Sequence, residues 1–163
     1  MKRLFFCLIA LLALSGAGNK LGAQTPYVGG SLTAYYVNSF ALSTTVIGGY
    51  EFNDSWAVGG SLGFDIAPSP APQISLFARW TPWHNDVLFV DVKLRAEGYF
   101  SEQFHFTSAD AGLVGSLRFR VSGHVDIFAD VANLGARIYR GGDVLPMIGM
   151  FADTARMGVL YRF

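Results

Sequence analysis

The clearest pattern in the chain is a two-residue alternation from Leu88 to Gly98. Even-numbered positions there carry Leu, Val, Val, Leu, Ala and Gly, whereas odd-numbered positions from Asp91 onward carry Asp, Lys, Arg and Glu. Because successive side chains of a β-strand point to opposite faces, the segment is predicted to be a strand with one apolar and one charged face. In a soluble protein the apolar face would be buried, and in a membrane barrel it would face lipid.

The same period predicts eight strands along the chain. By residue number they are 26–37, 41–52, 56–66, 73–83, 88–100, 109–121, a seventh that starts at 124 and a last one that ends at 163. Turn-forming residues separate the strands, as at Asn53 to Ser55, and three prolines place residues 67–72 in a loop. The alternation loses its phase near Asn133 to Ala136, which predicts a β-bulge there.

The polar faces of these strands together hold equal numbers of acidic and basic residues. The acidic residues are Glu51, Asp65, Asp91, Glu97, Asp110, Asp126 and Asp130, and the basic residues are Arg79, Lys93, Arg95, Arg118, Arg120, Arg156 and Arg162. The interior of an eight-stranded barrel is just wide enough for side chains to fill it, and an unpaired charge there costs several kcal/mol. Equal numbers therefore predict a lumen closed by an ion-pair network.

The opposite faces are almost free of charge, and aromatic residues gather where strands end. One rim is predicted to hold Tyr50, Phe52, Trp56, Trp80, Tyr161 and Phe163, and the other Tyr36, Phe64 and Phe100. An apolar belt between two aromatic bands is typical of outer-membrane barrels. A secreted soluble barrel, the alternative, would bury the charge-free face and would have no reason to place aromatic residues at its rims. We therefore predict an all-β protein, an eight-stranded antiparallel up-and-down transmembrane β-barrel.

The N-terminus has the three-part layout of a secretory signal peptide. Two basic residues precede an apolar run from Leu4 to Leu14, which is too short to span a bilayer as a helix, and small residues follow it. Cleavage is expected after Ala23, with cleavage after Ala17 as the alternative. Residues 1–23 are thus predicted to be a signal peptide and residues 24–163 the outer-membrane β-barrel domain.

Composition and spacing exclude several classes of function. Loss of residues 1–23 removes three of the twelve basic residues, which leaves nine against twelve acidic ones, and such a chain is not expected to bind nucleic acid. The single cysteine, Cys7, leaves with the signal peptide, and the three histidines lack the spacing of metal ligands. The glycine pairs lie within strands and form no phosphate loop. We expect neither a metal nor a cofactor.

Two segments, residues 47–64 and 156–163, resemble the small eight-stranded outer-membrane β-barrel proteins of Gram-negative bacteria, the class that contains outer membrane proteins A and X. The first resembles that family's strand–turn–strand unit, and the second, with Tyr161 and Phe163, resembles its terminal assembly signal. The resemblance implies a monomer in the bacterial outer membrane, in contact with its lipid and lipopolysaccharide. It also implies recognition by the barrel-assembly machinery during insertion.

The expected role is non-catalytic, in envelope integrity or in surface interaction and adhesion, because this scaffold alone does not define an activity. The alternatives are a narrow pore or conduit for hydrophobic solutes, and a lipid A-modifying enzyme. The enzyme alternative depends on residues 105–112, which resemble the His-x-Ser-Asn-Ala-Gly segment of the lipid A 3-O-deacylase family, where a histidine activates a serine. Here Thr107 stands in place of the serine and Asp110 in place of the asparagine, and the segment lies farther from the C-terminus.

A candidate binding loop follows the turn formed by residues 140–143. Residues 144–151 are predicted to lie at or above the outer rim, and Pro146 is expected to interrupt any β-ladder there. The large apolar residues of this loop are Val144, Leu145, Met147, Ile148, Met150 and Phe151. The loop either folds over the barrel mouth or rests on the outer leaflet, or it forms an exposed patch that captures a hydrophobic ligand or an extracellular partner protein.

Overall fold

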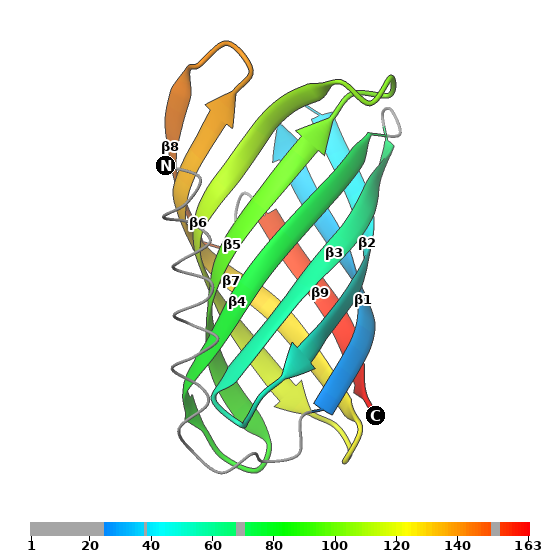
Figure 1. The fold of residues 1–163 in the computed structure, drawn as a ribbon, viewed down its shortest axis with the longest axis vertical. Helices are drawn as coiled ribbons and strands as arrows, with labels where there is room; N and C mark the ends of the chain where they lie inside the picture. The colour runs from blue at the N-terminus through cyan, green and yellow to red at the C-terminus, as the bar shows by residue number, and fades with distance from the viewer. Residues whose placement is uncertain (1–24, 38, 68–70, 151–153) are drawn as a thin grey trace.

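Nine β-strands make up the described part of the computed structural model, which covers residues 25–37, 39–67, 71–150 and 154–163 (Figure 1). The strands are β1 (Thr25–Val37), β2 (Ser39–Glu51), β3 (Trp56–Ala67), β4 (Pro72–His84), β5 (Leu88–Phe100), β6 (Phe106–Arg120), β7 (Val125–Tyr139), β8 (Val144–Met150) and β9 (Thr154–Arg162). Within these residues no helix is long and apolar enough to cross a membrane. The predicted signal peptide and its cleavage sites lie outside the described residues.

Eight of the strands close into an antiparallel barrel. Each strand from β1 to β7 pairs with its neighbour in sequence, and β9 closes the barrel between β1 and the first half of β7. The second half of β7 pairs instead with β8, so that these two strands continue as a hairpin beyond the β1–β9 seam (Figure 1). This arrangement confirms the predicted eight-stranded antiparallel barrel and adds one strand segment to it.

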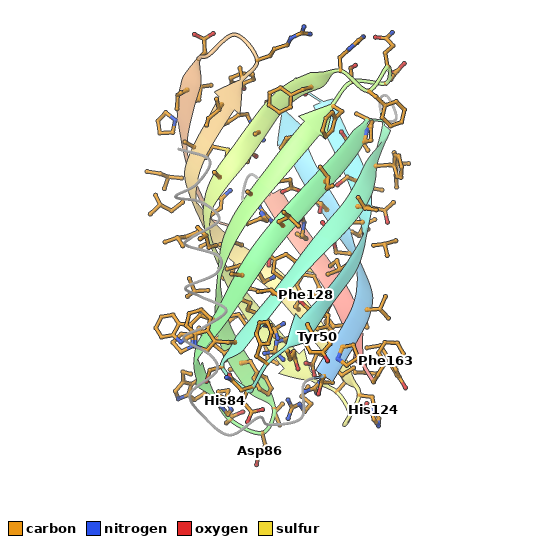
Figure 2. All side chains as sticks on the ribbon, viewed as in Figure 1. Tyr50, His84, Asp86, His124, Phe128 and Phe163 are labelled. Atoms are coloured by element: carbon orange, nitrogen blue, oxygen red, sulfur yellow. The ribbon has the colours of Figure 1, made fainter. Side chains whose placement is uncertain are left out.

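The two ends of the barrel differ. At the end that we call the terminal end, Phe163 donates its backbone N–H to the carbonyl of Pro26 at 3.2 Å, so the start of β1 and the end of β9 lie together. Two turns at this end have the same design, because the side-chain oxygens of Asn53 and Asn85 each accept two backbone N–H groups of the following residues. Figure 2 shows Tyr50, His84 and Phe163 gathered at this end.

At the opposite end, which we call the hairpin end, two turns share one backbone geometry. In Ser101–His105 and in Tyr139–Asp143, the first residue donates to the carbonyl of the fifth, and the fourth donates to the carbonyl of the first, all at 2.8–2.9 Å. This turn requires a positive φ at its fourth residue, which Gly142 adopts freely at 92°. In the other turn that residue is Phe104, with φ of 60° and a side chain that is 73% exposed. A non-glycine residue in this conformation costs about 1–2 kcal/mol.

The structure differs from the sequence prediction at two places in β6 and β7. The strand β6 begins at Phe106, not at residue 109, because its first residues extend the hairpin with β5. The predicted bulge exists, but it lies at Val131: Gly115 pairs with Ala132 and Ser116 pairs with Asp130, which leaves Val131 as the extra residue. The residue that follows it, Ala132, is compatible with either face, so the alternation alone could not locate the bulge.

The side chains alternate between an apolar outer surface and a largely polar lumen, as predicted. Exposed outer residues include Val46, Val58, Leu62, Leu76, Leu94, Leu113, Ile127 and Val159. The lumen also contains one apolar layer, formed by Tyr27, Ile47, Ala57, Phe77, Phe128 and Leu160. A soluble protein would place its apolar side chains inside, whereas here most of them cover the outside of the barrel wall.

Candidate functional site

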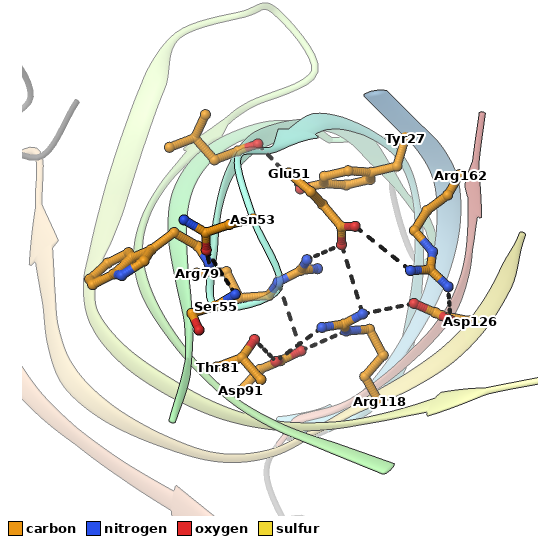
Figure 3. Close-up of polar contacts among 12 residues, drawn as sticks. Tyr27, Glu51, Asn53, Ser55, Arg79, Thr81, Asp91, Arg118, Asp126 and Arg162 are labelled. Carbon is orange, nitrogen blue, oxygen red and sulfur yellow. Dashed lines mark hydrogen bonds and ion pairs between the residues drawn. The ribbon is translucent and has the colours of Figure 1, made fainter. Parts of the chain in front are cut away.

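The lumen near the terminal end is filled by a cluster of ion pairs with Arg118 at its centre (Figure 3). The Nε atom of Arg118 lies 2.9 Å from Asp91 Oδ2, and its Nη1 atom lies 2.7 Å from Asp126 Oδ2. The side chain of Arg118 is only 2% exposed, and both carboxylates are fully buried. This one guanidinium therefore pairs with two buried acidic residues from β5 and β7, and Arg79, Arg120 and Arg162 supply the further positive charge.

Further residues extend this group, which we call the terminal cluster. Glu51 pairs with Arg79 and lies 3.9 Å from Arg162, which also donates to Asp126 Oδ1 at 3.1 Å. The full set is Glu51, Arg79, Asp91, Arg118, Arg120, Asp126 and Arg162. Thr81 also donates its hydroxyl to Asp91 at 2.6 Å. Residues from β2, β4, β5, β6, β7 and β9 are thus linked across the lumen.

A second group, the mid-lumen cluster, consists of Lys93, Arg95, Glu97, Asp130 and Arg156. Lys93 Nζ lies 2.7 Å from Asp130 Oδ1, and Arg156 Nη2 lies 2.8 Å from Glu97 Oε1. Lys93 and Glu97 lie on β5, whereas their partners Asp130 and Arg156 lie on β7 and β9, which do not pair with β5. The long basic side chains reach across the narrow lumen. In this cluster, ion pairs therefore form between strands that are not adjacent in the sheet.

A third group, formed by one ion pair and a tyrosine, lies nearer the hairpin end. Arg137 donates from Nε and Nη2 to the two oxygens of Asp110, each at 2.7 Å, and the Tyr99 hydroxyl donates to Asp110 at 3.1 Å. Arg137 was not among the predicted lumen residues. The bulge at Val131 explains the omission, because even-numbered residues of β7 face inward before it and odd-numbered residues face inward after it. Every predicted lumen residue except Asp65 takes part in these three groups.

The apolar layer separates the two larger clusters. Phe128 lies between Asp126 and Asp130 on the inner face of β7, and Leu160 lies between Arg156 and Arg162 on β9. Cations cover its aromatic rings: Lys93 Nζ lies 4.5 Å from the Phe128 ring centre, and the Arg79 guanidinium lies 5.5 Å from that of Tyr27. Side chains therefore occupy the lumen at two successive levels, the terminal cluster and the apolar layer, with one small cavity beside the layer.

On the hairpin side of this layer the packing is less complete. One small cavity adjoins the apolar layer itself, and a second lies farther toward the hairpin end. Arg95, Asp130 and Arg156 line both cavities. Buried polar atoms without a hydrogen-bond partner in the described structure occur on both sides of the layer. They include Gln73 Nε2 and Glu97 Oε2 on the hairpin side, and the Nε atoms of Arg79, Arg120 and Arg162 in the terminal cluster. Among the described residues, no group of three or more His, Cys, Asp or Glu side chains could hold a metal ion.

The residues that resemble a deacylase site do not come together around a reacting group. His105 lies in the exposed turn, and the Thr107 hydroxyl donates to the carbonyl of Tyr99 at 2.9 Å. Asp110 points into the lumen and is held by Arg137. The register of β5 with β6 shifts within this segment, because Phe100 pairs with Phe106 whereas Tyr99 pairs with Ser108. The pattern in the sequence is therefore split between the turn and the lumen.

The candidate binding loop is a strand over most of its length. Residues Val144–Met150 form β8, which pairs in register with β7 through Ala136 and Pro146, so the expected interruption at Pro146 does not occur. The backbone nitrogen of Pro146 faces away from β7 in this register, so the missing N–H breaks no bond. The strand extends the barrel wall and does not fold over the mouth. The side chain of Met150 and the whole of Phe151 lie outside the described residues.

Comparisons with known proteins support the fold and no finer assignment. No family model matches the chain, and no curated protein matches it. A de novo designed transmembrane β-barrel has a TM-score of 0.53 at 12% identity, with 85% of this chain and 95% of that chain covered. The Yersinia pestis outer membrane protein Ail, in a phospholipid bilayer nanodisc, has a TM-score of 0.50 at 16% identity, with 85% and 99% covered. The chain thus has the fold of the small eight-stranded outer-membrane barrels.

Proposed function

We propose that the chain is a non-catalytic integral protein of the bacterial outer membrane that acts through surface interaction at its hairpin end. The observation that carries the proposal is the contrast between a filled lumen and an exposed apolar hairpin. Ion pairs and the apolar layer occupy the lumen, which leaves little support for a pore, a solute conduit or a catalytic centre within it. The hairpin end, by comparison, presents large apolar side chains that the barrel does not need for its own closure.

The outer surface supports a membrane location. Its apolar side chains form a belt, and aromatic pairs lie at the terminal end, where Trp56 and Trp80 stack with ring centres 6.2 Å apart. At the hairpin end Phe100 and Phe106 meet edge to face at 6.1 Å. Lipid-facing barrels carry such aromatic residues at both interfaces. We infer that the terminal end faces the periplasm and the hairpin end faces outward.

Replacing Phe163 by aspartate should prevent insertion. The Phe163 ring packs edge-on against Tyr161, with ring centres 5.3 Å apart, and its side chain is exposed at the barrel rim, where an assembly machinery could bind it. We expect the variant to remain in the periplasm, as measured by membrane fractionation and by the loss of heat-modifiable migration on a gel. Phe104→Asp is the control, because it changes an equally exposed phenylalanine at the other end and should insert normally. Normal membrane yield of the Phe163 variant would contradict the proposed location and assembly signal.

The β7–β8 hairpin is the proposed interaction surface. Its outer face holds Leu134, Ile138, Val144 and Ile148, all exposed, and Ile148 reaches 78%. Opposite them, on the lumen-facing side, Leu145 is also exposed. Since β8 pairs with β7 alone among the described strands, one edge and both faces of the hairpin are accessible. Contiguous apolar surface of this kind marks protein or membrane contact.

A photo-crosslinking amino acid at position 148 should form adducts with protein in intact cells. The control carries the same amino acid at position 94, where Leu94 is exposed in the middle of the barrel belt and should react with lipid only. Mass spectrometry of the adducts distinguishes the two outcomes. Replacing Val144 and Ile148 by serine in the full-length barrel should remove binding of the captured protein without changing heat-modifiable migration. Lipid adducts alone at position 148 would show that the hairpin rests on the outer leaflet.

A further inference from the structure

We propose that the mid-lumen cluster binds one small monovalent anion of the size of chloride, held by Arg95 and Arg156. This site is independent of the surface interaction proposed above. It follows from the charge of the cluster, from the distances within it and from the space beside it.

The mid-lumen cluster carries one more cation than anion. Its cations are Lys93, Arg95 and Arg156, and its carboxylates are Glu97 and Asp130. The terminal cluster has the same excess of one, but its Arg120 side chain is 30% exposed, so water can solvate that charge. Arg95 is 15% exposed and lies deeper in the lumen, where an uncompensated charge is more costly.

Among the described residues, the distances identify Arg95 as the cation of this cluster with the longest carboxylate contacts. Lys93 and Arg156 each hold one carboxylate at hydrogen-bonding distance, 2.7 Å to Asp130 and 2.8 Å to Glu97. Arg95 reaches the same two carboxylates only at 3.4 Å in each case. A charged hydrogen bond is normally 2.7–2.9 Å long, so Arg95 retains donor capacity that these contacts do not use.

Space for a ligand adjoins these donors. The two cavities of the lumen share Arg95 and Arg156 as lining residues, so an ion in either would lie beside both basic residues. Two buried polar atoms in the same half of the lumen, Gln73 Nε2 and Glu97 Oε2, have no hydrogen-bond partner among the described residues, although neither residue lines the cavities. The described protein groups alone therefore do not complete the hydrogen bonding in this half of the lumen.

The chemistry limits the ligand to a small, singly charged anion. One excess positive charge is available, and a monovalent anion neutralises it. Asp130 lines both cavities as well, and its carboxylate repels any anion in proportion to the charge of that anion, so a divalent oxyanion is disfavoured more than a monovalent ion. Chloride is the abundant ion with this charge and size.

The test compares the thermal stability of the folded barrel in chloride and in gluconate at equal ionic strength. A ligand that binds only the folded state raises the unfolding temperature as its concentration rises. We expect the temperature of the gel-mobility transition to increase with chloride, and bromide to have the same effect. Arg95→Gln should abolish this dependence, whereas Arg120→Gln, which removes the excess cation of the terminal cluster, should retain it.

Bromide diffraction provides a second measurement that requires no variant. Crystals of the unmodified barrel grown in bromide should show an anomalous peak in contact with the Arg95 and Arg156 guanidinium groups. Identical transition temperatures in chloride and gluconate would overturn the proposal, and so would a chloride dependence that Arg95→Gln leaves unchanged. A bromide structure without a peak in either cavity would also overturn it.

Discussion

Replacing Arg118 by leucine is expected to lower the free energy of unfolding by about 3–5 kcal/mol, since removal of one partner leaves buried charges uncompensated. Arg118 alone contacts both Asp91 and Asp126, at 2.9 and 2.7 Å, and all three side chains are almost completely inaccessible to solvent. Its guanidinium also lies 4.3 Å from the Phe89 ring centre, so the variant loses a cation–π contact as well. Urea unfolding of the barrel in lipid vesicles measures the change.

Arg137→Leu is the matched control for Arg118→Leu. Arg137 forms an equally short pair with Asp110, at 2.7 Å, but its side chain is 34% exposed. Water can take the place of the exposed guanidinium, and the Tyr99 hydroxyl still donates to Asp110, so this variant should lose clearly less stability than Arg118→Leu even though Asp110 itself is buried. Equal effects of the two substitutions would mean that the terminal cluster is hydrated and loosely packed, contrary to the geometry of its ion pairs.

Replacing Gly135 by valine should have a comparably large effect through the backbone. Gly135 and Gly112 pair across β7 and β6, and a Cβ atom at Gly135 would lie 2.8 Å from the Gly112 Cα and closer still to the carbonyl oxygen of Ala111. Backbone atoms cannot move aside without opening the β6–β7 ladder, so we expect a loss of about 3 kcal/mol, at the upper end for an overpacked site. The folded fraction after refolding into vesicles measures it.

Gly48 offers the control for the glycine substitution. It also lies within a strand, but a Cβ atom built there meets nothing within 4 Å. Gly48→Val should therefore fold as well as the unmodified chain. If both valine variants folded equally well, the close approach of β6 and β7 would not be a requirement of the barrel.

The sequence predicted the barrel because alternation is a local property of each strand. The segment from Asp91 to Glu97 identified both faces of β5, and the same reasoning placed Arg118 and Asp126 in the lumen. Which side chains then pair depends on distances across the lumen, and these depend on the closed barrel as a whole. Asp130 accordingly pairs with Lys93, 37 residues away, which no local pattern could indicate.

Two features escaped prediction for identifiable reasons. Before the bulge at Val131 the even-numbered residues of β7 face the lumen, and after it the odd-numbered residues do. If the alternation of the first half is continued through the bulge, Arg137 is placed on the outer face. The strand β8 escaped because a proline within an apolar run usually indicates a loop, and only the register shows that the Pro146 nitrogen faces the open edge. In both cases the decisive information is the hydrogen-bond pattern of the sheet.

The position of Pro146 has a consequence for the behaviour of many copies in one membrane. An unpaired strand edge with free N–H groups is a template on which other chains can add strands and aggregate. Among the described strands, β8 pairs only with β7, so its other edge is such a template. Pro146 removes a donor from the middle of that edge, and an incoming strand would find its ladder broken there. Crowded barrels are therefore kept from joining edge to edge.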